Sequence, residues 1–295
     1  MEPLDELVST DSTKLKIFRF RGREGIRLGI EVENILFALP ADSGPAEISE
    51  WLSQTDPIGW ILDKKKKTAA TIVESEIEIL TPVDVQEVWA SGVTYLRSKV
   101  ARIEESQQGG DFYDRVYDAE RPELFFKSTA GRVVGCNQPI RVRRDSEWNV
   151  PEPELVLVIS SRGKVVGYTI GNDVSSRSIE GENPLYLPHA KVYDGGCAMG
   201  PAILVKTDGQ NTERRIGMTI SREGDIVFEG EVSTEKIKRT EEELAEYLFR
   251  ELTFEHGVFL FTGTGIVPPD DFTLLSGDVV RISIEGIGTL ENPVA

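Results

Sequence analysis

Histidine and cysteine, the usual ligands of transition metals, are scarce in this chain. Only His189 and His256 occur among 295 residues, and the cysteines are Cys136 and Cys197 alone. Protein zinc sites take most of their ligands from these two residue types, so a zinc centre of several His or Cys ligands is nearly excluded. Any bound metal should therefore be a hard cation held by oxygen atoms. We interpret the two cysteines as reduced, buried, small apolar residues.

Long apolar runs and basic tracts are also missing. No stretch of about 18 uncharged apolar residues occurs, so no membrane-spanning segment is expected. The first residues are acidic and lack the basic start and apolar core of a secretory signal, which predicts a cytoplasmic protein. The net charge is −17 and no basic run is longer than Lys64–Lys67. Such a charge repels polyanions, so we expect no nucleic-acid partner.

Apolar residues make up 39% of the chain, enough for one large core and a smaller domain. Near the N-terminus, Lys14–Phe20 and Ile26–Glu33 alternate apolar and polar residues as half-buried strands do. Short helices are predicted at Ala46–Leu52 and Ile58–Lys65, and Thr81-Pro82 is a plausible boundary. These patterns predict an α+β, β-rich protein with a small N-terminal α+β domain (1–80) and a larger catalytic domain (81–295).

Strand patterns dominate the larger domain. We expect strands at Leu124–Lys127, Ile140–Arg144, Glu154–Ser160, Lys164–Ile170, Ala202–Val205, Gly217–Arg222, Ile226–Glu229 and Val279–Ile284. A helix is predicted at Thr240–Leu252, where Thr240 and Glu243 have the spacing of a capping box. The charged stretch from Leu96 to Asp118 is expected to be a mobile surface segment that closes over the site.

Two carboxylates stand at the start of an apolar strand, in Pro151-Glu152-Pro153-Glu154-Leu155. Residues i and i+2 of a strand point to the same face, so Glu152 and Glu154 can converge on one point. Facing carboxylates repel, and a divalent cation between them relieves that repulsion. Taken alone, however, the motif is explained as well by a solvated strand end.

Three further segments carry polar groups at the ends of predicted strands or in Gly-rich loops. Asp173 follows an apolar strand, where its carboxylate can meet the other two. Lys191 precedes the Gly-rich loop that leads to Gly200-Pro201. Thr262-Gly263-Thr264-Gly265 is a turn whose backbone N–H groups and hydroxyls suit an anion such as a carboxylate.

The order of these segments along the chain resembles the fumarylacetoacetate hydrolase superfamily, over roughly residues 87–294. Several stretches look closest to its 2-keto-3-deoxy-D-arabinonate dehydratases, namely Arg121–Lys127, Asp145–Trp148, Glu182–Pro188 and Thr262–Pro268. The resemblance implies a core of curved mixed and antiparallel sheets and a homo-oligomer. It also implies a small-molecule partner, a 2-keto-3-deoxy sugar acid.

Site residues follow from the same resemblance. Glu152, Glu154 and Asp173 match the three metal ligands of the family, with Mg²⁺ as the expected ion and Mn²⁺ as the alternative. Lys191 matches the active-site lysine, which also contacts the substrate. Two further sets have assigned roles: Thr264 with Gly263 holds the substrate carboxylate, and Glu123 lies beside the metal as the acid–base residue. Lys127 is interpreted as structural, and Arg177 either orients carboxylates or forms a structural ion pair.

One departure from the family decides between reactions. Its hydrolases and decarboxylases carry a His and a Glu that activate water, and the corresponding positions here are Ser98 and Ala101. Loss of this general base disfavours hydrolysis. The resemblance thus predicts a hydro-lyase: Mg²⁺-dependent dehydration of 2-keto-3-deoxy-D-arabinonate (the same compound as 2-keto-3-deoxy-D-xylonate) to 2,5-dioxopentanoate. In it, Glu123 is expected to act as base at C3 and acid towards the C4 hydroxyl.

Two alternatives stay open at this stage. One is a Mg²⁺-dependent C–C hydrolase of acylpyruvates or diketo sugar acids that uses a different base. The other is a non-catalytic protein that binds sugar acids or only oligomerises. The clustered carboxylates and Lys191 argue against it, because carboxylates that repel one another gain nothing from clustering without a metal.

Overall fold

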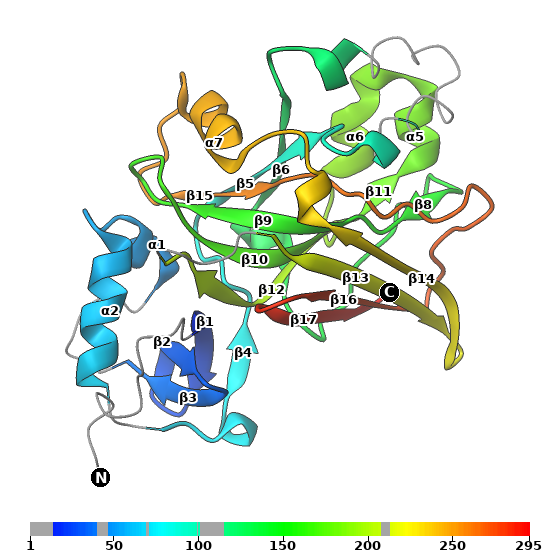
Figure 1. Ribbon diagram of the computed structural model, residues 1–295. Coiled ribbons are helices and arrows are strands. Elements are labelled where there is room, and N and C mark those ends of the chain that lie inside the picture. Colours follow the sequence, from blue (N-terminus) through cyan, green and yellow to red (C-terminus); the bar gives the residue numbers. More distant parts are fainter. Residues whose placement is uncertain (1–13, 40–46, 69–70, 99, 101–114, 208–212) are drawn as a thin grey trace.

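The computed structural model describes residues 14–39, 47–68, 71–98, 100, 115–207 and 213–295 (Figure 1). Its main feature is an 11-stranded mixed sheet. The strands follow in the order β3 (Ile35–Ala38), β2 (Gly25–Val32), β1 (Leu15–Gly22), β12 (Cys197–Val205), β10 (Val165–Asp173), β9 (Pro153–Ile159), β15 (Val258–Phe261), β5 (Glu87–Gly92) and β6 (Glu123–Thr129). Two short strands pair at the side, β4 (Glu78–Leu80) with β1 and β7 (Val133–Val134) with β12.

A second, antiparallel sheet packs against the main one. The strand order of the second sheet is β14 (Asp225–Ser233), β13 (Arg215–Arg222), β16 (Val279–Ile284) and β17 (Gly288–Pro293). A separate two-stranded sheet pairs β8 (Asn149–Val150) with β11 (Ser175–Ser176). The helices among the described residues include α1 (Ile48–Leu52), α2 (Pro57–Lys67), α5 (Arg177–Glu182), α6 (Leu187–Lys191) and α7 (Glu241–Phe249). In Figure 1, α1 and α2 lie near the β1–β3 end, and α5 and α6 lie together at the opposite side. Among the described helices, none is long and apolar enough to cross a membrane.

The central strand β9 explains why the two sheets share a core. Leu155 and Leu157 belong to the apolar cluster shared with the second sheet, whereas Val156 and Val158 belong to the cluster on the other face. Every residue of β9 is buried. The sequence of this strand is therefore a continuous apolar run rather than an alternating pattern, as expected for a strand that is covered on both faces.

Most elements predicted from the sequence are confirmed, but one strand is not. Only Ile140 of the predicted strand Ile140–Arg144 forms a bridge, with Val294. Further along, the guanidinium of Arg143 pairs with Asp145 at 2.6 Å. A turn follows at residues 144–145. The prediction was wrong because the backbone of this segment bonds to separate parts of the chain, Ile140 to Pro293 and Arg141 to Gly195, instead of to one neighbouring strand.

The division of the chain into domains at residues 1–80 and 81–295 stays a prediction. The two ranges share one sheet, because β1 in the first range pairs with β12 in the second. The closing segment between Leu96 and Asp118 also stays a prediction, because residues 99 and 101–114 of it lie outside the described residues.

Candidate functional site

The ends of five strands meet at one edge of the main sheet. β9 starts beside the end of β10 at Asp173, because these strands are antiparallel. β15 is also antiparallel to β9, so the residues after Phe261 lie beside the same start. β5 is parallel to β15 and β6 is antiparallel to β5, which brings Gly92 and Glu123 to this edge. The topology thus gathers polar residues from distant parts of the chain.

Three carboxylates converge at this edge. Glu152, Glu154 and Asp173 each offer an oxygen atom, and these oxygens lie within 4.8 Å of one another. The exposed fractions are 3%, 1% and 1%. The backbone brings Asp173 to Glu152 directly, because its N–H donates to the Glu152 carbonyl at 2.9 Å. The spacing of two residues between the glutamates puts both on the same face of the strand, as predicted.

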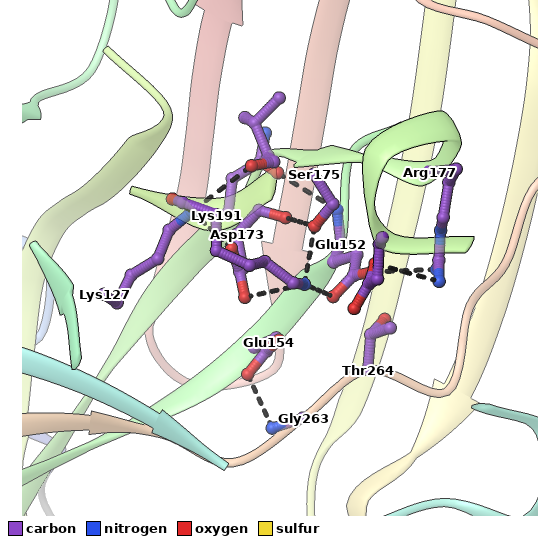
Figure 2. Close-up of polar contacts among 12 residues, drawn as sticks. Lys127, Glu152, Glu154, Asp173, Ser175, Arg177, Lys191, Gly263 and Thr264 are labelled. Carbon is purple, nitrogen blue, oxygen red and sulfur yellow. Dashed lines mark hydrogen bonds and ion pairs between the residues drawn. The ribbon is translucent and has the colours of Figure 1, made fainter. Parts of the chain in front are cut away.

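Lys191, from the end of α6, lies between two of the carboxylates (Figure 2). Its Nζ donates to Glu152 Oε2 at 2.8 Å and to Asp173 Oδ2 at 3.1 Å. It also donates to Ser175 Oγ at 2.6 Å. The lysine is 2% exposed, so the three contacts take up the three donors of a desolvated ammonium group. Lys191 therefore supplies positive charge between Glu152 and Asp173.

Two other buried cations form ion pairs with these carboxylates. Arg177 Nη2 pairs with Glu152 Oε1 at 2.8 Å. Lys127 Nζ lies 2.5 Å from Asp173 Oδ1 and also donates to the carbonyls of Val174 and Lys191. The buried Lys127 thus pairs with one carboxylate and donates to two backbone carbonyls, which agrees with a structural role. Arg177 both orients a carboxylate and forms an ion pair, so the two alternatives for it coincide.

Glu154 is the exception in the cluster. Within the described part of the chain it makes no ion pair, and its Oε2 accepts only the N–H of Gly263, at 2.5 Å. Burial, followed by the charges of Asp173 and Glu152, raises the pKa of this carboxyl well above its usual value. Gly263 has φ +91, and a Cβ there would lie 2.1 Å from Thr94 Oγ1, so only glycine fits this turn.

The chemistry of this donor set fits a divalent cation. All candidate ligands are carboxylate oxygens, which hard cations such as Mg²⁺ and Ca²⁺ prefer. The unpaired charge on Glu154 is a cost that a bound cation would remove. Glu152, Glu154 and Asp173 would hold the ion.

The remaining predicted site residues line the same cavity. Glu123 opposes Gly92 across the β5–β6 pair, and a Cβ on Gly92 would lie 2.1 Å from Glu123 Oε2. Thr264 lines the cavity with Gly263, and its hydroxyl contacts the backbone of Ile266 in the same turn. The free volume is about 20 Å³, room for roughly one water, so a larger ligand requires these side chains to move.

Two polar residues of the cavity, Glu180 and Ser91, were not predicted from the sequence. Glu180 lies on α5, three residues after Arg177, and is 3% exposed. Ser91, at the end of β5, is 2% exposed, and its hydroxyl has no partner among the described residues. The i, i+3 spacing of Arg177 and Glu180 is a signal for Glu180. No sequence pattern distinguishes Ser91 from a core serine.

Comparison with known proteins gives the family. The sequence model described as "Fumarylacetoacetate (FAA) hydrolase C-terminal" matches residues 87–295. The chain belongs to the fumarylacetoacetate hydrolase family. A Haloferax volcanii protein named "Probable 2-keto-3-deoxyxylonate dehydratase" is 51% identical over 214 residues, which cover 72% of this chain and 73% of that protein. The 2-dehydro-3-deoxy-D-arabinonate dehydratase of Saccharolobus solfataricus is 47% identical over 224 residues, 75% of each chain.

A solved structure of this family agrees with the fold over nearly the whole chain. It is the 2-keto-3-deoxy-D-arabinonate dehydratase complexed with magnesium and 2,5-dioxopentanoate, 38% identical to this chain. The match covers 95% of this chain and 98% of that one, with a TM-score of 0.81. The predicted β-rich α+β class and the family are thereby confirmed.

Proposed function

We propose that the protein catalyses the Mg²⁺-dependent dehydration of 2-keto-3-deoxy-D-arabinonate, which is also 2-keto-3-deoxy-D-xylonate, to 2,5-dioxopentanoate. The buried cluster of Glu152, Glu154 and Asp173 with Lys191 is the observation that carries the proposal, because it suits an α-keto acid bound to a divalent cation. The dehydratase names of two relatives at 51% and 47% identity support the substrate. The neighbour that binds magnesium supports Mg²⁺ over Mn²⁺.

The three carboxylates would hold the ion, and the chain supplies the charge around it. The chemistry that Mg²⁺ contributes when bound is Lewis-acid polarisation of a keto oxygen, which makes the neighbouring C–H protons more acidic. Lys191 Nζ, held between Glu152 and Asp173, offsets the negative charge that develops on the substrate. Gly263 and Thr264 line the cavity and are proposed to bind the substrate carboxylate.

Glu123 is proposed to remove a C3 proton. It enters the cavity from the start of β6, on a different element from each metal ligand. Gly92 leaves room for its carboxylate against β5. Removal of a C3 proton makes the C4 hydroxyl, which is β to the ketone, expellable.

Hydrolysis of a C–C bond is disfavoured by the residue at the position of the usual base. Ser98 is 6% exposed, and its hydroxyl donates to the Tyr95 carbonyl at 2.8 Å. A serine engaged in its own turn cannot accept a proton from water at neutral pH as histidine does. Ala101 lies outside the described residues.

Product analysis tests the proposal directly. Purified protein is incubated with 2-keto-3-deoxy-D-arabinonate, with and without Mg²⁺, and the products are identified by NMR. We expect 2,5-dioxopentanoate to appear only with the metal. Release of pyruvate from acylpyruvates, with no product from the sugar acid, would instead make the protein a C–C hydrolase.

Gly92→Ala should slow turnover without unfolding the protein. The new methyl group would lie 2.1 Å from Glu123 Oε2, so the carboxylate must move. Displacement of a reacting group by about 1 Å can cost on the order of 10²-fold in rate. Glu123→Gln should lose on the order of 10²–10⁴-fold, the usual contribution of an acid–base group. Both are measured as kcat with saturating Mg²⁺.

Gly131→Ala is the matched control for Gly92→Ala. A Cβ at Gly131 meets no atom within 4 Å, so its kcat should equal that of the unmodified protein. Full activity in Gly92→Ala would show that the reaction does not require Glu123 in its observed position beside Gly92.

A further inference from the structure

Glu180 is a buried carboxyl group of the cavity that lies outside the metal cluster. It belongs to the first turn of α5, where the hydroxyl of Ser176 caps the helix by accepting the N–H of Ile179. Its exposed fraction is 3%, although most glutamates are exposed. Apart from the three proposed ligands, Glu123 and Glu180 are the carboxyl groups among the described residues that line the cavity.

Arg177 places Glu180 close to the metal cluster. Its guanidinium lies 2.8 Å from Glu152 Oε1 through Nη2 and 3.8 Å from Glu180 Oε2 through Nη1. Glu152 is a proposed metal ligand, and the guanidinium of Arg177 lies between it and Glu180. The Arg177 contact with Glu152, at 2.8 Å, is the shorter of the two.

The proposed reaction requires proton transfer at more positions than one carboxylate serves. The C3 proton leaves, the C4 hydroxyl must be protonated to depart as water, and a C5 proton must then leave. If one carboxylate did all of this, it would give the C3 proton to the departing water and then have to serve C5, two carbons away. Two carboxyl groups in opposite protonation states avoid that difficulty.

We infer that Glu180 is the second catalytic acid–base residue, acting at C4 and C5 while Glu123 acts at C3. This inference rests on the proposed function. Glu123 takes the C3 proton, and Glu180 in its acid form protonates the C4 hydroxyl as the C4–O bond breaks, which gives water and a C3=C4 enone. The Glu180 carboxylate then removes a C5 proton, and Glu123 returns its proton to C3.

Protons balance over these reaction steps. The species left after these steps is the enol with a C4=C5 double bond and a hydroxyl on C5. It becomes the aldehyde when C4 gains a proton and the C5 hydroxyl loses one. Glu123 ends as the carboxylate and Glu180 as the acid, their starting states, and one water has been lost with no oxidant or reductant.

Two reactions separate the roles of the carboxyl groups. Dehydration of 2-keto-3-deoxy-D-arabinonate needs both residues, whereas exchange of the C3 protons of 2-oxobutanoate with D₂O needs only the metal and the base at C3. In Glu180→Gln, we expect kcat for dehydration to fall on the order of 10²–10⁴-fold. The exchange rate, followed by NMR with Mg²⁺, should stay within about threefold. Glu123→Gln should lose both reactions.

Glu182→Gln is the matched control, because Glu182 lies on the same helix and is exposed; both of its rates should be unchanged. Loss of both reactions in Glu180→Gln would mean that Glu180 only supports Arg177 and the metal cluster. Retention of both would remove it from the reaction. If the unmodified protein exchanges 2-oxobutanoate but never dehydrates the sugar acid, the proposed function fails instead.

Discussion

Glu154→Gln should abolish Mg²⁺-dependent turnover and at the same time stabilise the metal-free protein. Glu154 is a fully buried proposed ligand whose only described partner is the N–H of Gly263. Glutamine keeps that acceptor and removes a charge that faces Asp173 and Glu152. Loss of residues that merely support a ligand costs about 10–100-fold in activity or metal affinity, so loss of the ligand should cost at least about 100-fold.

The gain in stability should depend on pH. Because the pKa of Glu154 is raised in the folded protein, the carboxylate form is disfavoured there relative to the unfolded chain. Below the ordinary pKa of 4.5 the group is protonated in both states and costs nothing. The loss of folding free energy caused by Glu154 grows as the pH rises from 4.5 towards the raised pKa. At pH 8 without metal, the variant should be more stable by about 1–3 kcal/mol, as measured by chemical denaturation in EDTA.

Glu152→Gln is the control for this prediction. It removes a ligand of the same type, but one that pairs with both Arg177 and Lys191. Activity should again be lost, whereas the metal-free protein should become less stable, because two buried cations lose a partner. Equal effects of the two substitutions on stability would contradict the assignment of Glu154 as the carboxylate without a cation.

Lys191→Met should reduce kcat and make the fold depend on the metal. The substitution keeps a long apolar side chain but leaves Glu152 and Asp173 with one cation each, Arg177 and Lys127. Removal of a donor that stabilises developing charge lowers kcat about 10²–10³-fold. Breaking a buried ion pair destabilises the metal-free protein by about 3–5 kcal/mol.

Thermal melting with and without Mg²⁺ measures the second effect. Mg²⁺ should raise the melting temperature of Lys191→Met more than that of the unmodified protein, because the ion replaces a missing positive charge. Lys164→Met serves as control, since Lys164 is exposed and both its melting curves should match the unmodified protein. A smaller Mg²⁺ effect in Lys191→Met would mean that Lys191 supports ion binding instead of substituting for it.

The sequence was most informative where the chemistry follows from local spacing. The alternation in Lys14–Phe20 and Ile26–Glu33 predicted two strands, β1 and β2, and the structure pairs them along their length. The two-residue spacing of Glu152 and Glu154 predicted convergence because it depends on strand geometry alone. The order of motifs then led to Asp173 and Lys191 through the family resemblance, and both contact the same cluster.

The partners that hold the cluster could not be predicted in the same way. Lys127 pairs with Asp173 although β9, β15 and β5 separate β6 from β10 in the sheet, and no local pattern relates the two residues. Glu180 was missed because the side of a short helix that faces the cavity depends on how α5 packs. The error at Ile140–Arg144 has the opposite origin, since a local pattern suggested a strand that the tertiary contacts of Ile140 end after one bridge.

The assembly of the cluster also bears on how the chain folds. β9 and β10 are neighbours in sequence and pair as a hairpin, which brings the three carboxylates together early. The cations that pair with them belong to other elements, namely β6, α5 and α6. A partly folded chain with the hairpin alone therefore carries clustered negative charge without relief. Divalent cations present during refolding would bind such an intermediate and speed the search for the native state.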